Sequence, residues 1–269
     1  MKKFCATLLV LMIPFAVAGC SGSPTSTPSP TEEPTPQPSP TLTIALVEVA
    51  PVEVTFPAGD AAHTTIHGTL YGQNPIGVIF THDGQLNSDR GDWLPFAEQV
   101  AAYGYMVLIY DNRGYGETGG SSGGSGGITA SMDGALAFMR EQGAEQLILV
   151  SSGTAGIYGI KLACENANGD IVGNAAISAA RVSFDNTIAV GRTELTTLTM
   201  PTLWAVTSED EVRFEDTQAM YELAGGTDKQ LLIYPGMIRG ADILRDEESG
   251  PDLAQHLLAF ILRAAPIGE

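Results

Sequence analysis

The sequence predicts an α/β fold in which a mostly parallel sheet is covered by helices on both faces. Short apolar runs such as residues 76–81 and 105–110 are typical of strands buried on both faces. These runs alternate with segments whose apolar residues recur at helical spacing. Because such alternation builds a parallel sheet from strand, helix and strand units, we expect one α/β domain over residues 42–269.

The elements follow in order from their local patterns. Three segments rich in β-branched residues, 44–49, 52–56 and 64–71, are separated by Pro and Gly and predict antiparallel leading strands. The strands expected after them are 76–81, 105–110, 146–151, 171–178, 201–207 and 230–234, and the expected helices are 93–103, 128–142, 155–167, 213–224 and 252–264. Residues 179–200 leave room for a short cap over the sheet or for none.

The N-terminus has the three regions of a secretory signal. Two lysines precede an apolar run over residues 4–19, which ends in Val-Ala-Gly directly before Cys20. This ending resembles the lipobox of bacterial lipoproteins, which implies cleavage before Cys20 and a lipid anchor on its sulfur. An uncleaved membrane span is the alternative, but the run is shorter than the roughly 20 residues a span needs and contains Pro14. We therefore expect a signal peptide over 1–19, the lipidated Cys20 with a disordered Pro/Ser/Thr-rich linker over 20–41, and the domain over 42–269.

Composition excludes several classes of partner and cofactor. The net charge of −18 argues against binding to nucleic acid and against adsorption to anionic lipid. Cys164 is the one cysteine within residues 42–269, so no disulfide is expected there, and its apolar neighbours predict an inert thiol. No cluster of Cys or His suggests a metal site, and no Lys lies between Lys3 and Lys161 to serve a phosphate-binding loop. We expect no cofactor.

Two loops carry a family resemblance. His82, Asp83 and Gly84 follow one predicted strand, and residues 111–118, which read Asp-Asn-Arg-Gly-Tyr-Gly-Glu-Thr, follow the next. This pattern resembles the α/β-hydrolases, which have a His-Gly pair after the third strand and an Asp-x-Arg-Gly-x-Gly-x-Ser-like loop after the fourth. The resemblance implies an α/β-hydrolase fold, and its Arg and Gly residues are expected to serve structure.

The catalytic triad of that family is incomplete in this chain. The family places its nucleophile in a G-x-S-x-G elbow after the fifth strand, and the corresponding position here is Gly153. Asp210 matches the triad acid. Arg239 stands where the family has its His, and arginine cannot accept a proton from a hydroxyl. We expect Arg239 and Asp210 to face each other as an ion pair, which either holds two loops together or leaves Arg239 partly free to bind an anion; the structural role is favoured.

Substitutes for the missing groups are few. Ser152 and Thr154 flank the elbow, and either one is the fallback nucleophile. None of the four histidines follows the last predicted strand, and His82 resembles a structural residue of the family. The backbone N–H of Thr154, with one near Asp83 or Gly84, is expected to form an oxyanion-like site whose attraction for anions the charge of Asp83 weakens.

Three interpretations of function follow. The first is a membrane-tethered, extracytoplasmic domain without catalytic activity that binds a small ligand or a protein partner. The alternative is an esterase or peptidase that uses Ser152 or Thr154 with Asp210. A purely structural component of the cell envelope is the third, and it would have no ligand in the cleft.

A Gly- and Ser-rich stretch, residues 119–127, is expected at the rim of the site with the composition of a flexible linker.

Overall fold

The computed structural model describes residues 46–166 and 168–268. The predicted signal peptide, Cys20 and the linker lie outside the described residues. The core side chains all lie between Phe56 and Ala265, within one folded unit that begins at Thr43. In this part of the chain no helix is long and apolar enough to cross a membrane.

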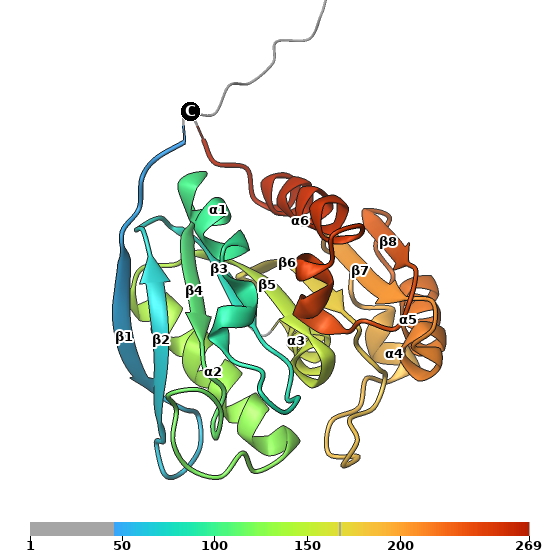
Figure 1. Cartoon of the computed structure of the whole chain (residues 1–269), viewed down its shortest axis with the longest axis horizontal. Coiled ribbons are helices and arrows are strands. Elements are labelled where there is room, and N and C mark those ends of the chain that lie inside the picture. Colours follow the sequence, from blue (N-terminus) through green and yellow to red (C-terminus); the bar gives the residue numbers. More distant parts are fainter. Residues whose placement is uncertain (1–45, 167, 269) are drawn as a thin grey trace, which may run out of the picture. The chain divides into compact units, whose positions relative to one another are not determined.

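The described residues form an eight-stranded sheet with the order β1-β2-β4-β3-β5-β6-β7-β8 (Figure 1). β2 pairs antiparallel with β1 and with β4, and the other neighbouring pairs are parallel. The prediction of a mostly parallel sheet with antiparallel leading strands is therefore confirmed. The strands are β1 (Pro51–Pro57), β2 (Thr65–Tyr71), β3 (Ile76–Thr81), β4 (Met106–Tyr110), β5 (Gln146–Ser152), β6 (Ile171–Ile177), β7 (Thr202–Thr207) and β8 (Lys229–Tyr234).

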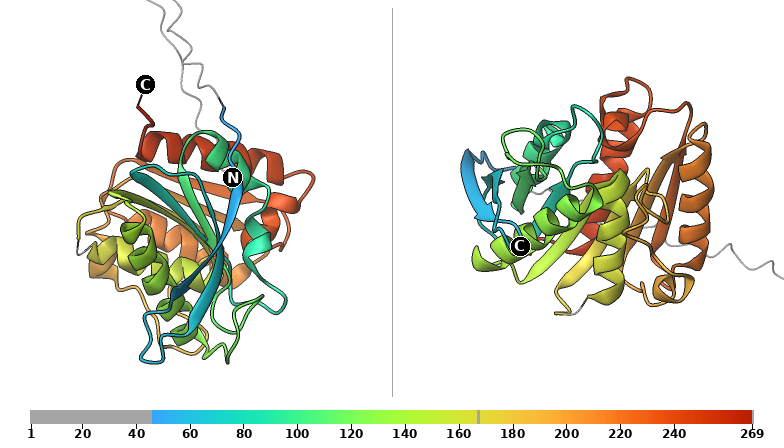
Figure 2. Two further views of the ribbon diagram at one scale, coloured as in Figure 1. Left: turned by 90° about the vertical axis from the view of Figure 1, so that its left-hand side faces the viewer. Right: turned by 90° about the horizontal axis from the view of Figure 1, so that it is seen from below.

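Helices cover both faces of the sheet, and each face has its own apolar core (Figure 2). Along β4 the buried side chains alternate, with Leu108 in one core and Val107 in the other. One core receives α2 (Ser125–Glu141), α3 (Gly153–Glu165), α4 (Arg192–Leu195) and α5 (Glu211–Leu223), and the other receives α1 (Phe96–Ala102) and α6 (Gly250–Ala264). Burial on both faces explains why the central strands are apolar throughout, as the sequence indicates.

The predicted strand over residues 44–49 is wrong in its described part. Residues 46–50 form no strand, and the N–H of Val47 donates to the carbonyl of Ala102 at the end of α1, at 2.8 Å. β1 pairs with β2 alone and is an edge strand of the sheet, but residues 46–50 do not pair with its free edge and lie beside the end of α1 instead. Their β-branched composition therefore did not by itself specify a strand.

The predicted helix over residues 93–103 is broken into two. A 3-10 helix, η1 (Arg90–Trp93), precedes α1, and Leu94 between them is extended, with ψ 149°. Pro95 disfavours a helical conformation in the residue before it, which explains the interruption. The helices predicted over 128–142 and 155–167 begin earlier, at Ser125 and Gly153, and the second shift affects the site.

The two ends of the described chain lie at the edge of the sheet where the parallel strands begin. Near this edge, the Tyr105 hydroxyl donates to the carbonyl of Ala265 at 2.7 Å. The loops that follow the parallel strands gather at the opposite edge (Figure 1). The segment between β6 and β7 holds only α4 and the isolated β-bridge between Val182 and Ala189, so the cap is short, as predicted.

Candidate functional site

The strand-to-helix turn after β5 has the geometry of a nucleophile elbow. β5 ends at Ser152 and α3 begins at Gly153, with no loop between them. Gly153 has a φ of +53°, in the left-handed region where a side chain costs about 1–2 kcal/mol. Glycine adopts this conformation freely, so the turn is kept while the residue at its tip has no side chain to react.

Asp83 fills the space beside Gly153. Its carboxylate lies where a Cβ atom at position 153 would be, so the two cannot occupy the site together. Oδ1 accepts the N–H groups of Gly84 and Thr154, at 2.7 and 3.0 Å, and Oδ2 accepts from Nε2 of Gln85 at 2.9 Å. The side chain is almost entirely buried, and a carboxylate is favoured at the N-terminus of α3.

The oxyanion-like site expected from the sequence is therefore assembled but filled. The N–H groups of Thr154 and Gly84 do converge, and the anion they hold is the carboxylate of Asp83 itself. Sequence reasoning expected Asp83 only to weaken the attraction for an anion. The available signal was an acidic residue between His82 and Gly84, at the position next to the donors.

Asp210 and Arg239 form an ion pair at the expected place. Asp210 lies between β7 and α5, and Arg239 follows β8. Nε of Arg239 lies 2.9 Å from Oδ2 of Asp210, and Nη2 donates to Oδ1 at 3.2 Å. Arg213 donates to the same carboxylate at 3.4 Å. Since the side chain of Asp210 is 1% exposed, these cations offset the cost of burying its charge.

His82 serves the structure of its loop. Nε2 accepts the N–H of Asn112 at 2.9 Å, so Nδ1 carries the proton and donates to the carbonyl of Asp83 at 2.7 Å. The ring is fully buried, and this burial lowers the pKa of His82 below its ordinary value. Both nitrogens are thus engaged by backbone, and the neutral ring orients Asp83. The remaining histidines lie elsewhere: His63 in a turn, His67 on β2 and His256 on α6.

Neither fallback nucleophile has its hydroxyl hydrogen-bonded to a base among the described residues. The Oγ atom of Ser152 is buried and has no hydrogen-bond partner among the described residues. Thr154 donates its backbone N–H to Asp83 and lies on the other side of the elbow, beside Val182 and Phe184. Asp210, the expected acid, is held by two arginines and orients no histidine.

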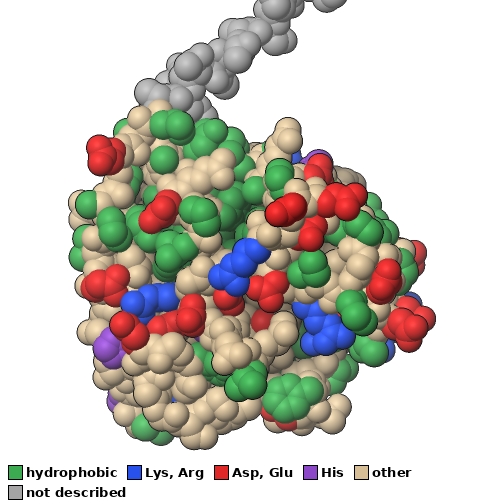
Figure 3. Space-filling model, in the orientation of Figure 1, with side chains coloured by type: hydrophobic (Ala, Val, Ile, Leu, Met, Phe, Trp, Pro, Cys, Tyr) green, Lys and Arg blue, Asp and Glu red, His purple; other side chains and the backbone are tan. Residues whose placement is uncertain are grey.

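A polar cleft lies between the loop after β3 and the loop after β8. Its volume is about 260 Å³. Carboxylates and guanidinium groups both line it, and acidic and basic side chains also lie side by side on the face shown in Figure 3. The lining residues are Asp83, Gln85, Leu86, Asn87, Ser88, Asp92, Ser152, Arg239, Ala241, Asp242 and Arg245. Among the described residues no group of three or more His, Cys, Asp or Glu side chains is arranged to hold a metal ion.

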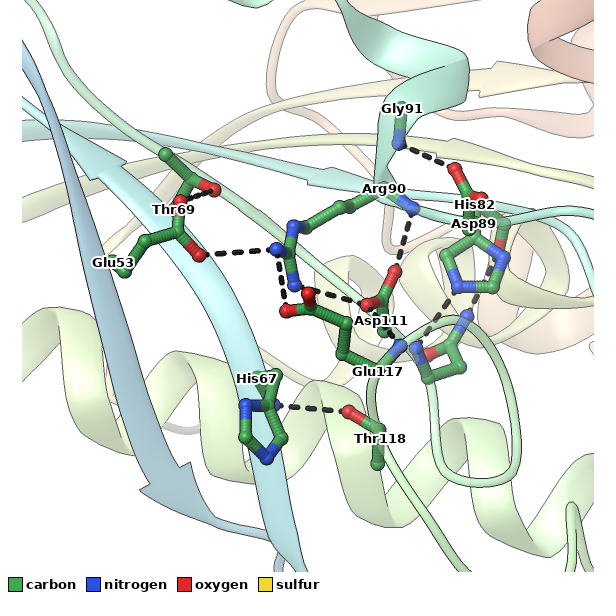
Figure 4. Close-up of polar contacts among 11 residues, drawn as sticks. Glu53, His67, Thr69, His82, Asp89, Arg90, Gly91, Asp111, Glu117 and Thr118 are labelled. Atoms are coloured by element: carbon green, nitrogen blue, oxygen red, sulfur yellow. Dashed lines mark hydrogen bonds and ion pairs between the residues drawn. The ribbon is translucent and has the colours of Figure 1, made fainter.

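A charged network supports the loops that carry this site (Figure 4). Asp111 accepts the backbone N–H groups of Arg90 and Glu117, both at 2.8 Å, and pairs with the Arg90 guanidinium at 3.0 Å. Arg113, the arginine of the hydrolase-like motif, pairs with Asp60 at 2.9 Å. These residues orient backbone and do not line the cleft, so the motif acts here as a framework.

The Gly- and Ser-rich stretch differs from a free linker at its end. Residues 125–127 belong to α2, and Asp185 from the short cap accepts both the N–H and the hydroxyl of Ser125, at 3.0 and 2.8 Å. The hydroxyl of Ser183, with these and other donors, holds the pKa of Asp185 well below its usual range. The cap segment is therefore fastened to the start of α2.

Comparison with known proteins shows the fold. No protein-family model matches the chain. A protein of Agrobacterium fabrum named as the carbamate hydrolase RutD is 29% identical over 101 residues, which cover 38% of this chain and 37% of the relative. The chain thus matches little more than a third of that relative's length.

Solved structures match over a much larger share. The Paleococcus ferrophilus monoacylglycerol lipase has a TM-score of 0.61 and 15% identity, over 74% of this chain and 99% of the lipase. The Pyrococcus furiosus esterase Pf2001 has a TM-score of 0.63 and 14% identity, over 80% of this chain and 93% of the esterase. These matches, with the strand order, show an α/β-hydrolase fold.

Proposed function

We propose that the folded unit binds a small ligand or a protein partner in the cleft and does not carry out serine-hydrolase chemistry. The observation that carries this proposal is the carboxylate of Asp83, which fills the space of a side chain at position 153. The same carboxylate takes the N–H groups of Thr154 and Gly84, which an oxyanion would need. Nucleophile, base and oxyanion site are thus replaced together.

The competing function is an esterase or peptidase that uses Ser152 or Thr154. The hydrolase names of the similar proteins favour it. Its weakness is the lack of a proton acceptor, since Arg239 stays protonated and His82 uses both nitrogens on backbone. Fold alone does not decide between the two functions, because unrelated activities share this architecture.

We also propose that a lipid on Cys20 tethers the domain at the extracytoplasmic side of the cell membrane. The support is the sequence around Cys20 and the Pro-, Ser- and Thr-rich segment after it. The described chain enters the fold through residues 46–50, beside the end of α1, whereas the cleft lies at the opposite edge of the sheet.

Ester hydrolysis by residues 43–269, which contain both cores, tests the catalytic part of the proposal. The substrates are p-nitrophenyl acetate, p-nitrophenyl butyrate and a p-nitrophenyl carbamate. The native unit should show only background hydrolysis. Saturable turnover that disappears in Ser152→Ala or Thr154→Ala would establish the competing function.

A pair of restored variants isolates the role of Asp83. Gly153→Ser/Arg239→His returns the nucleophile and the base but leaves the carboxylate in place, so it should stay inactive. Adding Asp83→Ala clears the space and frees the N–H groups of Thr154 and Gly84. The triple variant should therefore exceed the double variant in hydrolysis, and equal rates would show that Asp83 is not the obstacle.

A further inference from the structure

The cleft presents opposite charges at two places. Asp83 contributes a carboxylate at its inner end, and Arg239 contributes a guanidinium that is 42% exposed. The contacts of Arg239 with described side chains go to Asp210, which Arg213 also contacts, so two cations share one carboxylate there. Arg213, Arg239 and Asp210 together therefore carry one excess positive charge. Elsewhere in the lining Arg245 pairs with both Asp92 and Asp242, which leaves one excess negative charge there.

Asp83 keeps room for one further donor. A carboxylate offers about four acceptor positions. Three are used by Gly84, Thr154 and Gln85. All three donors are neutral, so they leave the charge of Asp83 without a cationic partner among the described residues. A ligand that brings one positively charged donor completes this set.

Ser152 supplies an independent sign of a ligand. It is 1% exposed, borders the cleft, and its hydroxyl has no described hydrogen-bond partner. The side chain packs against Gly240, next to Arg239, and Ser152 precedes Gly153, which abuts Asp83. Ser152 thus lines the same cleft as both charged groups. Buried polar groups of native proteins are almost always hydrogen-bonded, so this hydroxyl indicates a polar atom that the cleft receives.

The size and lining of the cleft narrow the class of ligand. A volume of about 260 Å³ lies below the range of roughly 300–1,000 Å³ that is usual for pockets of drug-sized ligands, so it suits a ligand of the size of an amino acid. No aromatic residue lines the cleft, so a sugar ring would find no flat apolar face to stack on. Charges of both signs, by contrast, match a ligand that itself carries both signs.

We infer that the cleft binds a small zwitterion of the amino-acid type, with its ammonium group on Asp83 and its carboxylate on Arg239 and the Ser152 hydroxyl. The inference rests on the proposed function and gives it a ligand class. Asp83 then has two roles: it closes the oxyanion site through Gly84 and Thr154, and it receives the ammonium group.

Calorimetric titration of residues 43–269 with each of the common L-amino acids, one at a time, tests the inference. For the amino acid that binds best, the N-acetyl derivative and the carboxamide remove one charge each. We expect each blocked form to bind at least tenfold more weakly than the free amino acid. D-Glucose, which matches the polar lining without the charges, should not bind.

Variants of this chain provide the second arm of the test. Arg239→Met should weaken binding at least tenfold, as should Asp83→Asn, which keeps the acceptor oxygen and removes the charge. Arg263→Met is the matched control, because Arg263, near the end of α6, is 41% exposed, pairs with Asp228 directly before β8 and does not line the cleft. It should leave binding unchanged, and the melting temperature of each variant reports its folding.

The outcomes separate this inference from the proposed function. Equal binding of the free and blocked amino acids, or binding of D-glucose alone, overturns the zwitterion assignment. The absence of binding by every amino acid also overturns it, and leaves the proposed function standing if esters are not hydrolysed. Ester turnover by the native unit overturns the proposed function whatever the amino acids do.

Discussion

Replacement of Gly153 measures how tightly Asp83 fills the elbow. Gly153→Ala places a Cβ at a φ of +53°, which costs about 1–2 kcal/mol of stability. The same Cβ overlaps the carboxylate of Asp83, and forced repacking of this kind costs about 1–3 kcal/mol more. We therefore expect the single change to lower the free energy of unfolding by about 2–5 kcal/mol.

A double-mutant cycle separates the two contributions. In an Asp83→Ala background the carboxylate is gone, so Gly153→Ala should cost only the ~1–2 kcal/mol of backbone strain. The coupling energy between the two positions should then be about 1–3 kcal/mol. Urea unfolding, followed by the fluorescence of the buried Trp93 and Trp204, gives each free energy.

Gly169 provides the control for backbone strain. Its φ is +70°, and a Cβ there would meet no atom of the described residues within 4 Å. Gly169→Ala should therefore cost about 1–2 kcal/mol and should show no coupling to Asp83→Ala. If the Gly153 and Asp83 changes were additive to within about 0.5 kcal/mol, the carboxylate would not occupy the elbow and the reasoning would fail.

The remaining predictions concern single groups. Burial lowers the pKa of His82 in the folded protein, so below about pH 6.5 the unfolded chain binds a proton that the folded chain does not. The free energy of unfolding should therefore fall as the pH drops below about 6.5. In His82→Gln the free energy of unfolding should depend less steeply on pH. Burial raises the pKa of Cys164 to about 11, so iodoacetamide at pH 8 should alkylate it far more slowly in the native protein than in urea, as mass spectrometry measures. Cys20→Ala in the full chain should abolish labelling by radioactive palmitate and partition into detergent, whereas Cys164→Ala should change neither.

Much of the fold could be predicted because short stretches of sequence carry the apolar patterns that specify its strands and helices. The central strands are apolar throughout since helices cover both faces, and the sequence shows this directly. The errors have physical reasons. Residues 46–49 have strand composition, but Val47 donates to the end of α1 and the segment does not pair with β1. Pro95 interrupts a segment whose apolar spacing is otherwise helical.

The positions of the site residues and the pairing of Arg239 with Asp210 could be predicted from the sequence, but the contacts of Asp83 could not. Arg239 and Asp210 meet because the loops after β7 and β8 lie side by side. The contact of Asp83 with Thr154 joins residues 71 positions apart and depends on the conformation of one side chain. No periodicity or spacing in the sequence reports such a conformation. The unpartnered hydroxyl of Ser152 likewise becomes visible only when its surroundings are known.

The most direct test of the central claim is intact-protein mass spectrometry after treatment with a fluorophosphonate, which labels activated serine nucleophiles. We predict that residues 43–269 remain unmodified in the native sequence, because position 153 at the tip of the elbow has no hydroxyl and Asp83 fills the space of a side chain there. The Asp83→Ala/Gly153→Ser/Arg239→His variant serves as the positive control and should gain one adduct. One adduct per native chain, mapped to Ser152 or Thr154, would contradict the account and establish a hydrolase.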